Sequence, residues 1–389
     1  MNQLQSQEHI VLASSPDPEN IYTGSPSIAR LSSGRLIVSY EWFRPKPFKE
    51  SVPNSTEILV SDDNGHTWEM ISCQDFIWAT IWTSENHAYL IGNKRKTRDI
   101  IIARSLDGCL SWEGPNTLFE GKYHCAPTTV LIHNGFAYRA FETCDAPSRS
   151  DWKSLLIAGN LSEDLLNPQA WRMSNHVDFP GIPDVLSQRK YPESMEKKVP
   201  ADSFLEGNVV LVDGEIRMIM RTIIDGHSTS SLASIGRITD DGNVLNYRFL
   251  QFYPMPGAQC KFQIVHDPIS QLYWTTVTLA TNSWQKQEPL RQIGYSGPPG
   301  NERRILVLMY SVDALNWFQA GCVAMSRNMM ESFSYASQVI SGKDLMVVAR
   351  TSSGGKNQHD TNLVTLHRIK NFRDFALDLR PQDLPDVIK

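Results

Sequence analysis

The chain has 389 residues, of which 41% are hydrophobic and 20% are charged, so it can bury a large core and is not predicted to be disordered. At this length we expect either two or three ordinary domains or one large β architecture. The 37 basic and 42 acidic side chains give a net charge of −5, which argues against a protein that binds nucleic acid non-specifically. No apolar run approaches the roughly 18 residues of a membrane helix, and the start MNQLQSQEHIVLASS lacks signal-peptide features, so we expect a cytoplasmic protein without membrane contact.

The cysteine pattern and the absence of common motifs narrow the chemistry. The six cysteines are dispersed without a CxxC pair, so the sequence predicts neither a disulfide framework nor a metal site. No glycine-rich phosphate-binding motif is present, so no nucleotide cofactor is expected. The ten tryptophans and twelve tyrosines favour β-rich cores and the stacking surfaces on which sugars are held.

Short apolar runs recur along the whole chain, separated by Gly, Asp, Asn and Pro, which predicts β-strands joined by hairpins and very little helix. In chain order, the clearest predicted strands are 35–43, 56–63, 99–105, 127–132, 135–142, 208–213, 214–222, 304–311 and 344–351. The sequence therefore predicts an all-β protein.

One octet recurs between these strands. SDDNGHTW (61–68) has the pattern S-x-D-x-G-x-T-W, which is typical of a hairpin turn because Asp accepts hydrogen bonds from the turn's own amides and Gly permits positive φ. Further copies, increasingly degenerate, occur at 105–112, 311–317, 239–247 and 162–171.

These octets resemble the Asp-box, or BNR repeat, of the sialidase superfamily, whose fold is a six-bladed β-propeller. The resemblance implies one propeller domain over residues 1–389, with Asp-box hairpins on the face opposite the pocket. Taking each octet as the turn between a blade's third and fourth strands, we expect blades near 26–72, 77–119, 126–174, 206–251, 261–323 and 334–369, with 7–13 closing the ring. Insertions at 176–204 and 283–302 are too long for turns and are expected to shape a site.

In a propeller the first strand of each blade begins, and the second ends, at the pocket face. This rule brings charged strand ends to one axis, where burial is costly unless the charges pair with each other or with a ligand. The excess of Arg and Lys favours an anionic ligand, although Glu–Arg pairs could also simply satisfy each other. The residues predicted at this face include Glu41, Trp42, His124, Arg139, Glu142, Glu206, Asn208, Arg221, Lys261, Arg303 or Arg304, Tyr335 and Arg350.

Sialidases bind the substrate carboxylate with three arginines and use a tyrosine nucleophile activated by a glutamate. Residues 204–222 resemble the segment with the activating glutamate and the second arginine, which implies these roles for Glu206 and Arg221. Residues 331–351 are similar to the last blade with its nucleophile, which implies Tyr335.

Two further segments complete the resemblance, and two positions depart from it. Residues 302–317 imply Arg303, or its neighbour Arg304, as the third arginine, and SYEWF (39–43) implies that Glu41 steadies an arginine. At the position of the first arginine, however, this chain has Gly24, and the loop after Glu41 has no Asp, so that Glu50 is the available acid there.

Other segments point to a different subgroup. Residues 122–142 and 256–277 are similar to propeller enzymes that attack glycans linked through uronic acids or deoxysugars, in which a histidine is the acid or base. This implies an alternative catalytic pair, His124 with Glu142, although His124 could equally be a hydrogen-bonding residue behind the site. Of the tryptophans, Trp42 and Trp284 are the expected sugar-stacking residues, whereas Trp78 and Trp82 are expected to fill gaps between blades.

The leading hypothesis is a sialidase-like exo-glycoside hydrolase that removes a terminal acidic sugar from an acidic oligosaccharide, without a cofactor or metal. Arg221 and Arg303, with Arg350 or Arg139, would bind the carboxylate. One alternative is a lyase that acts by β-elimination on a uronic-acid-containing glycan. The other is a non-catalytic glycan-binding propeller, which the loss of the first arginine and of the Asp would suit.

Overall fold

The computed structural model describes residues 4–43, 55–183, 202–224, 231–283, 285–295, 297 and 299–381. Most of the predicted insertion 176–204, together with Glu50 and Trp284, lies outside these residues. The helices are short: α2 (Gln287–Gln292) and the 3-10 helices η1 (Arg149–Asp151), η2 (Pro168–Ala170), η3 (Pro299–Asn301) and η4 (Phe372–Phe375). Within the described ranges, no helix is long and apolar enough to cross a membrane.

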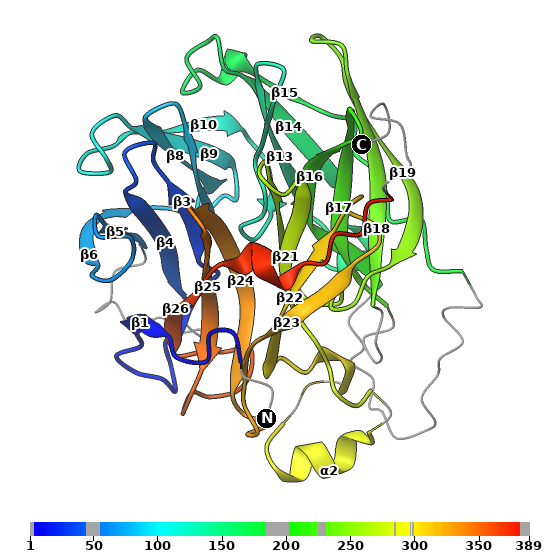
Figure 1. The fold of residues 1–389 in the computed structure, drawn as a ribbon. Helices are drawn as coiled ribbons and strands as arrows, with labels where there is room; N and C mark the ends of the chain where they lie inside the picture. Colours follow the sequence, from blue (N-terminus) through cyan, green and yellow to red (C-terminus); the bar gives the residue numbers. More distant parts are fainter. Residues whose placement is uncertain are drawn as a thin grey trace.

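Six antiparallel sheets surround a common centre (Figure 1), which confirms the prediction of an all-β, six-bladed propeller. Blade 1 comprises β2 (Tyr22–Thr23), β3 (Ser27–Arg30), β4 (Leu36–Phe43), β5 (Thr56–Ser61) and β6 (Glu69–Gln74). Blade 2 comprises β7 (Ile77–Ser84), β8 (His87–Asn93), β9 (Ile100–Ser105) and β10 (Glu113–Phe119). Blade 3 comprises β11 (Tyr123–His124), β12 (Leu131–His133), β13 (Phe136–Thr143), β14 (Ser154–Asn160) and β15 (Trp171–Met173). Blade 4 comprises β16 (Ser203–Val212), β17 (Glu215–Ile223), β18 (Leu232–Asp240) and β19 (Leu245–Pro254). Blade 5 comprises β20 (Gln263–Asp267), β21 (Leu272–Thr278), β22 (Ile305–Ser311) and β23 (Phe318–Met325). Blade 6 comprises β24 (Ser332–Ser341), β25 (Asp344–Ser352), β26 (Leu363–Ile369) and β1 (Ile10–Ser14).

The ring is closed by the N-terminal strand. β1 pairs antiparallel with β26, with Ile10 opposite Leu366, so blade 6 is built from both ends of the chain. Ahead of β1, the amides of Gln5 and Ser6 donate to the carbonyls of Cys322 and Val323 on β23 of blade 5. The N-terminal segment therefore joins blades 5 and 6.

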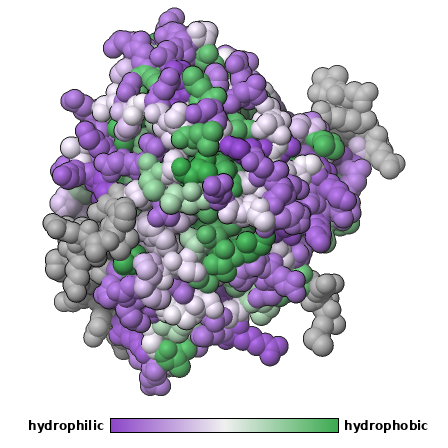
Figure 2. Space-filling view, turned by 90° about the vertical axis from the view of Figure 1, so that its left-hand side faces the viewer, coloured by the Kyte–Doolittle hydropathy of each residue, from purple (hydrophilic) through white to green (hydrophobic). Residues whose placement is uncertain are grey.

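Hydrophobic side chains fill the gaps between neighbouring blades. For example, Leu36 and Val38 of blade 1 pack with Met346 and Leu366 of blade 6 in one buried cluster. Because each strand alternates its side chains between two faces, both faces of a blade are covered by its neighbours. Figure 2 shows the outside of one flank, where hydrophobic residues gather in a central band among hydrophilic ones.

The Asp-containing turns connect third and fourth strands, as at β5–β6. Asp63 accepts hydrogen bonds from the Ser61 hydroxyl at 2.8 Å and from the amides of His66 and Thr67, both at 2.9 Å. Because the first strand of a blade runs away from the pocket and adjacent strands are antiparallel, these turns lie on the opposite face. That face also holds a cavity of about 1050 Å³ between the inner strands of blades 3, 4 and 5 and residues 379–381.

Candidate functional site

The innermost strands of blades 2, 4 and 6 carry the same irregularity at their pocket ends. Each pairing shifts register there, between Ile77 and Thr80, Leu205 and Asn208, and Ser334 and Ser337. Inside these bulges Trp78, Glu206 and Tyr335 adopt positive φ angles of 56°, 58° and 52°. A non-glycine residue in this region costs of order 1–3 kcal/mol, and such strain is concentrated at functional sites. The three bulges therefore single out Trp78, Glu206 and Tyr335 as candidate site residues.

Tyr335 is the centre of a cluster of arginines. The Nη1 atom of Arg221 lies 3.4 Å from the Tyr335 hydroxyl, and the Cζ atoms of Arg303 and Arg350 lie 5.1 and 4.7 Å from the centroid of its ring. Burial raises the pKa of Tyr335, but the positive charges, first of Arg221 and then of Arg303, outweigh burial and leave this pKa below its ordinary value. The surroundings therefore make the phenol proton easier to remove, which favours a nucleophilic role.

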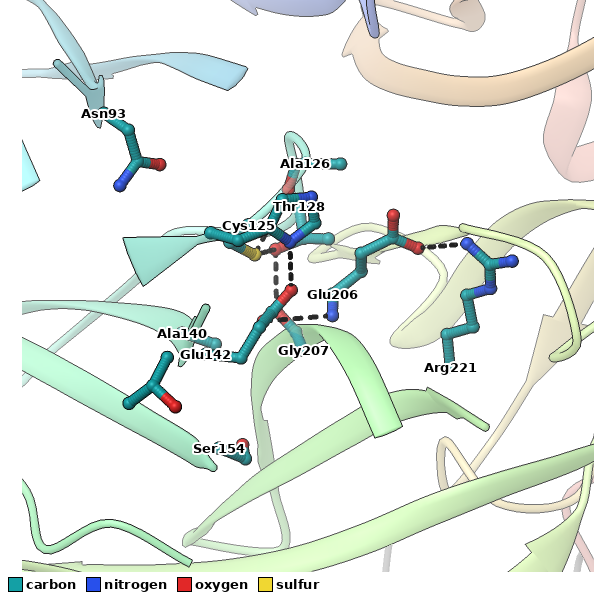
Figure 3. A network of polar contacts seen from close by, with 12 residues as sticks. Asn93, Cys125, Ala126, Thr128, Ala140, Glu142, Ser154, Glu206, Gly207 and Arg221 are labelled. Carbon is teal, nitrogen blue, oxygen red and sulfur yellow. Dashed lines mark hydrogen bonds and ion pairs between the residues drawn. The ribbon is translucent and has the colours of Figure 1, made fainter. Parts of the chain in front are cut away.

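Glu206 shares a partner with Tyr335. Its Oε2 atom accepts a hydrogen bond at 3.1 Å from the same Arg221 Nη1 atom that contacts the tyrosine hydroxyl. In Figure 3 the Glu206 side chain extends directly toward Arg221. Burial is the largest effect and raises the pKa of Glu206, but Arg221, His124 and Lys261 together outweigh it, so the pKa is lowered.

The two adjacent arginines predicted as alternatives have different surroundings. Arg304 forms an ion pair with Glu302 and donates to the Ser326 carbonyl at 2.7 Å. Arg303 faces Tyr335, and its buried Nη1 atom has no hydrogen-bond partner among the described residues. Of the two, Arg303 is therefore the arginine that lies against Tyr335.

A second pair lies beside the first. His124 Nδ1 is 2.5 Å from Glu142 Oε1, and Glu142 Oε2 accepts a hydrogen bond at 3.3 Å from the Glu206 amide (Figure 3). Burial raises the pKa of Glu142, while His124 opposes this effect. The imidazole lies between two indoles, with ring centroids 4.2 Å from Trp78 and 5.5 Å from Trp152. Both predicted catalytic pairs therefore belong to one continuous site.

Glu41 accounts for the glycine at the position of the missing arginine. Its two carboxylate oxygens accept from the Trp78 amide at 3.0 and 2.9 Å, and the side chain is buried. A Cβ atom added to Gly24 would collide with Glu41 Cγ. The space beside residue 24 is therefore occupied by Glu41, which would have to move to admit a larger residue there.

Two residues predicted to bind substrate are instead part of the packed interior. Trp42 is buried in the cluster between blades 1 and 6, and its indole N–H donates to Glu57 at 2.9 Å. Asn208 is fully buried, accepts from the amide of Ile264 at 3.1 Å and donates to the carbonyl of Phe262 at 3.2 Å. Neither is therefore placed to bind substrate as predicted, because neighbouring blades enclose both side chains.

Arg139 and Lys261, which were also predicted to bind substrate, are buried as well. Each has only 1% of its surface exposed and hydrogen-bonds to backbone and hydroxyl groups beneath the pocket, among them the Ala126 carbonyl for Arg139 and the Ala336 carbonyl for Lys261. Neither can contact a ligand directly in this arrangement.

The structure adds residues that the sequence analysis did not select. Trp78, expected to fill a gap, has its ring beside His124 and under Arg98, whose Cζ atom is 4.3 Å from the ring centroid. His359 has its ring centroid 6.1 Å from that of Tyr335, and 56% of its side chain is exposed. His359 lies in the connection from the second to the third strand of blade 6. Such connections lie at the pocket face, so the same strand-end rule could have found it.

No family model and no curated protein matches this sequence. Solved structures do match. The sialidase of Trypanosoma rangeli in complex with sialic acid is 13% identical, with a TM-score of 0.62, over 94% of this chain and 59% of that chain. An alpha-L-arabinanase of Penicillium chrysogenum complexed with arabinobiose is 14% identical, with a TM-score of 0.55, over 94% of this chain and 99% of that one. The GH93 alpha-L-arabinofuranosidase of Fusarium graminearum is 13% identical, with a TM-score of 0.52, over 94% and 98%.

The chain has the sialidase-type six-bladed propeller fold. At these identities the similarity establishes the architecture, and the chain spans about three-fifths of the sialidase. The residues at the centre of this propeller offer a phenol, a carboxylate, a carboxylate–imidazole pair and several guanidinium groups. This set can bind an anion, supply a nucleophile and transfer protons.

Proposed function

We propose that the protein is an exo-glycoside hydrolase that removes a terminal acidic sugar from an oligosaccharide. The observation that carries the proposal is the convergence of Arg221, Arg303 and Arg350 on Tyr335. Guanidinium groups match a carboxylate geometrically, so a cluster of three around one phenol favours an anionic sugar.

The proposed first step uses Tyr335 and Glu206. The Tyr335 oxygen adds to the anomeric carbon while the bond from this carbon to the leaving oxygen breaks, and Glu206 accepts the phenol proton. The shared contact with Arg221 Nη1 supports this pairing, because it brings the phenol and the carboxylate to one nitrogen. A tyrosine also avoids the repulsion that a carboxylate nucleophile would meet from an anionic sugar.

The proposed proton donor to the leaving oxygen is His124. Its Nδ1 atom is held by Glu142, so that its other ring nitrogen is the one that can exchange a proton with a substrate. In the second step a water molecule displaces Tyr335 and passes a proton to His124, while Glu206 returns its proton to the tyrosine. The proteins with matching folds are named as a sialidase, an arabinanase and an arabinofuranosidase, which supports glycoside hydrolysis on this scaffold.

The test is a screen of acidic oligosaccharides that end in nonulosonic or uronic acids, with products read by mass and by ultraviolet absorbance. Glu206→Gln keeps the size of the side chain but cannot accept the phenol proton, so we expect kcat to fall about 10²- to 10⁴-fold. Glu215→Gln, on β17 of the same blade but paired with Arg217 and Arg237, is the matched control and should leave kcat unchanged.

Other outcomes would replace the proposal. Full activity of Glu206→Gln would remove Glu206 from its role. A product with an ultraviolet-absorbing double bond would identify a β-elimination lyase. Sugar binding without turnover across the whole screen would identify a non-catalytic glycan-binding propeller.

A further inference from the structure

Two buried cations below the pocket, Lys261 and Arg139, have an unusual environment. Both are 1% exposed, and among the described residues neither is within 4 Å of a carboxylate oxygen, although the charge of Glu206 acts on Lys261. Burying a charge without a directly paired counter-ion is expensive, so these side chains depend on their hydrogen bonds. These hydrogen bonds identify the role of each side chain.

Lys261 is bonded to the backbone that carries Tyr335. Its Nζ atom donates to the Ala336 carbonyl at 2.6 Å and to the Ser337 hydroxyl at 2.9 Å. These are the two residues that follow Tyr335: Ala336 lies inside the β24 bulge, and Ser337 ends it, where the pairing with β25 resumes. The Ser337 hydroxyl in turn donates to the Pro26 carbonyl of blade 1 at 2.8 Å. One ammonium group from blade 5 therefore ties the bulge of blade 6 to blade 1.

The bulge needs such support. A bulge removes ladder hydrogen bonds from its extra residue, and Tyr335 has a positive φ of 52°, which a tyrosine adopts only when its surroundings impose it. Without the bond to the Ala336 carbonyl, the bulge would lose the buried charged donor that helps to fix its backbone. The direction of the Tyr335 side chain would then be less well determined, because this direction depends on the backbone angles inside the bulge.

We propose that Lys261 is a positioning residue that holds the β24 bulge and thereby keeps the Tyr335 hydroxyl beside Arg221 and Glu206. It acts through the backbone and does not contact the substrate. The inference rests on the proposed function insofar as Tyr335 is taken as the nucleophile, whereas the clamp on the bulge can be tested separately.

Arg139 shows the same arrangement at the other two bulges. Its Nη1 atom donates to the Thr128 hydroxyl at 2.6 Å, and that hydroxyl donates to the Gly207 carbonyl, also at 2.6 Å. Its Nη2 atom donates to the Thr80 hydroxyl at 3.0 Å. Gly207 follows Glu206, and Thr80 ends the bulge that contains Trp78. Buried cations thus support all three bulges that present site residues.

The ammonium group also gives the clamp a pH dependence. Burial lowers the pKa of Lys261 to about 7; Glu206 opposes this effect, Arg139 reinforces it, and the Cys125 thiol is the remaining titratable neighbour. Loss of the proton near neutral pH replaces a charged donor by a weaker neutral one. We therefore expect Lys261 to contribute to the alkaline limb of the kcat profile, in addition to the limb that deprotonation of the proposed proton donor His124 produces.

The experiment compares Lys261→Met, which keeps the length of the side chain but removes the ammonium group, with a matched control. Thr276→Val is that control, since Thr276 is equally buried and bonds from blade 5 to Gln338 of blade 6 at 2.9 Å, outside the bulge. For Lys261→Met we expect a fall in kcat of about 10²-fold with KM changed by less than about 2-fold. We also expect faster hydrogen exchange at the amides of residues 335–337. Thr276→Val should show none of these changes.

An unchanged kcat and an unchanged exchange rate in Lys261→Met would overturn the proposal. If the wild-type protein turns over no acidic glycan, the proposed function fails, but the exchange measurement still decides on the clamp. If Lys261→Met does not fold, Ser337→Ala removes one of the two acceptors. It must then accelerate exchange at 335–337 for the proposal to stand.

Discussion

The pKa of the buried Glu41 carboxyl is determined by the groups around it. Burial raises its pKa to about 7, although Arg95, the Trp78 amide and Arg350 all pull the value down. The carboxyl also fills the space beside Gly24. Near neutral pH this side chain therefore changes between a neutral and a charged form within the arginine cluster.

The raised pKa of Glu41 predicts that the stability of the protein depends on pH. Glu41 ionises near pH 4.5 in the unfolded chain and near pH 7 in the folded one, so its contribution is fully present below pH 4.5 and is lost as the pH rises to 7. The loss is of order 3 kcal/mol. Glu41→Gln should therefore reduce the decrease in melting temperature between pH 5 and pH 8, measured by thermal unfolding. The exposed Glu120→Gln is the control and should keep the wild-type decrease.

At the scale of elements, the turn at 105–112 shows why the Asp-containing octet suits a β-hairpin. Asp107 accepts from the Ser105 hydroxyl at 2.8 Å and the Ser111 amide at 2.9 Å. Cys109 has a φ of 77° at a position where the pattern has glycine, and its amide donates to the Ser105 hydroxyl at 2.8 Å. The turn's own hydrogen bonds hold a non-glycine residue in the left-handed region.

Asp107→Ala should lower the melting temperature and leave catalysis unchanged, because this turn lies on the face opposite the pocket. The hydrogen bonds, first from the Ser111 hydroxyl, lower the pKa of Asp107 to about 2. Its stabilising effect is therefore present above pH 4 and lost as the pH falls toward 2. Thermal unfolding and kcat together check this prediction, with the exposed Asp374→Ala as control. A change in kcat at unchanged stability would contradict the structural role of the turn.

At the scale of the whole molecule, the ring depends on one short strand. β1 covers the outer edge of blade 6 through its pairing with β26, and Leu12 packs against the cluster between blades 1 and 6. Without this strand, β26 would present unpaired backbone groups at an open edge, which invites association with other chains.

Leu12→Asp should therefore destabilise the closure, since it places a charge against an apolar cluster. We expect a lower melting temperature and a shift toward larger species in size-exclusion chromatography. Val11→Thr is the matched control, because Val11 is 47% exposed and threonine also favours strands. Equal behaviour of the two variants would show that β1 does not determine closure.

Much of the architecture follows from local physics and was predictable from the sequence. Alternating strands and repeated Asp-containing turns depend on neighbouring residues, so residues 61–68 alone indicate a hairpin. The strand-end rule also selected Glu206, Arg221, Arg303 and Tyr335, which the structure brings together.

The direction of individual side chains was decided by tertiary structure. Trp42 and Lys261 satisfy the same strand-end rule, yet other blades enclose both, and Lys261 supports Tyr335 from below. The Glu41 side chain fills the space beside Gly24, and no sequence pattern indicates this contact. The physical reason is that bulges and gaps between blades depend on residues far apart in the chain, whereas alternation and turn chemistry depend on residues within a few positions.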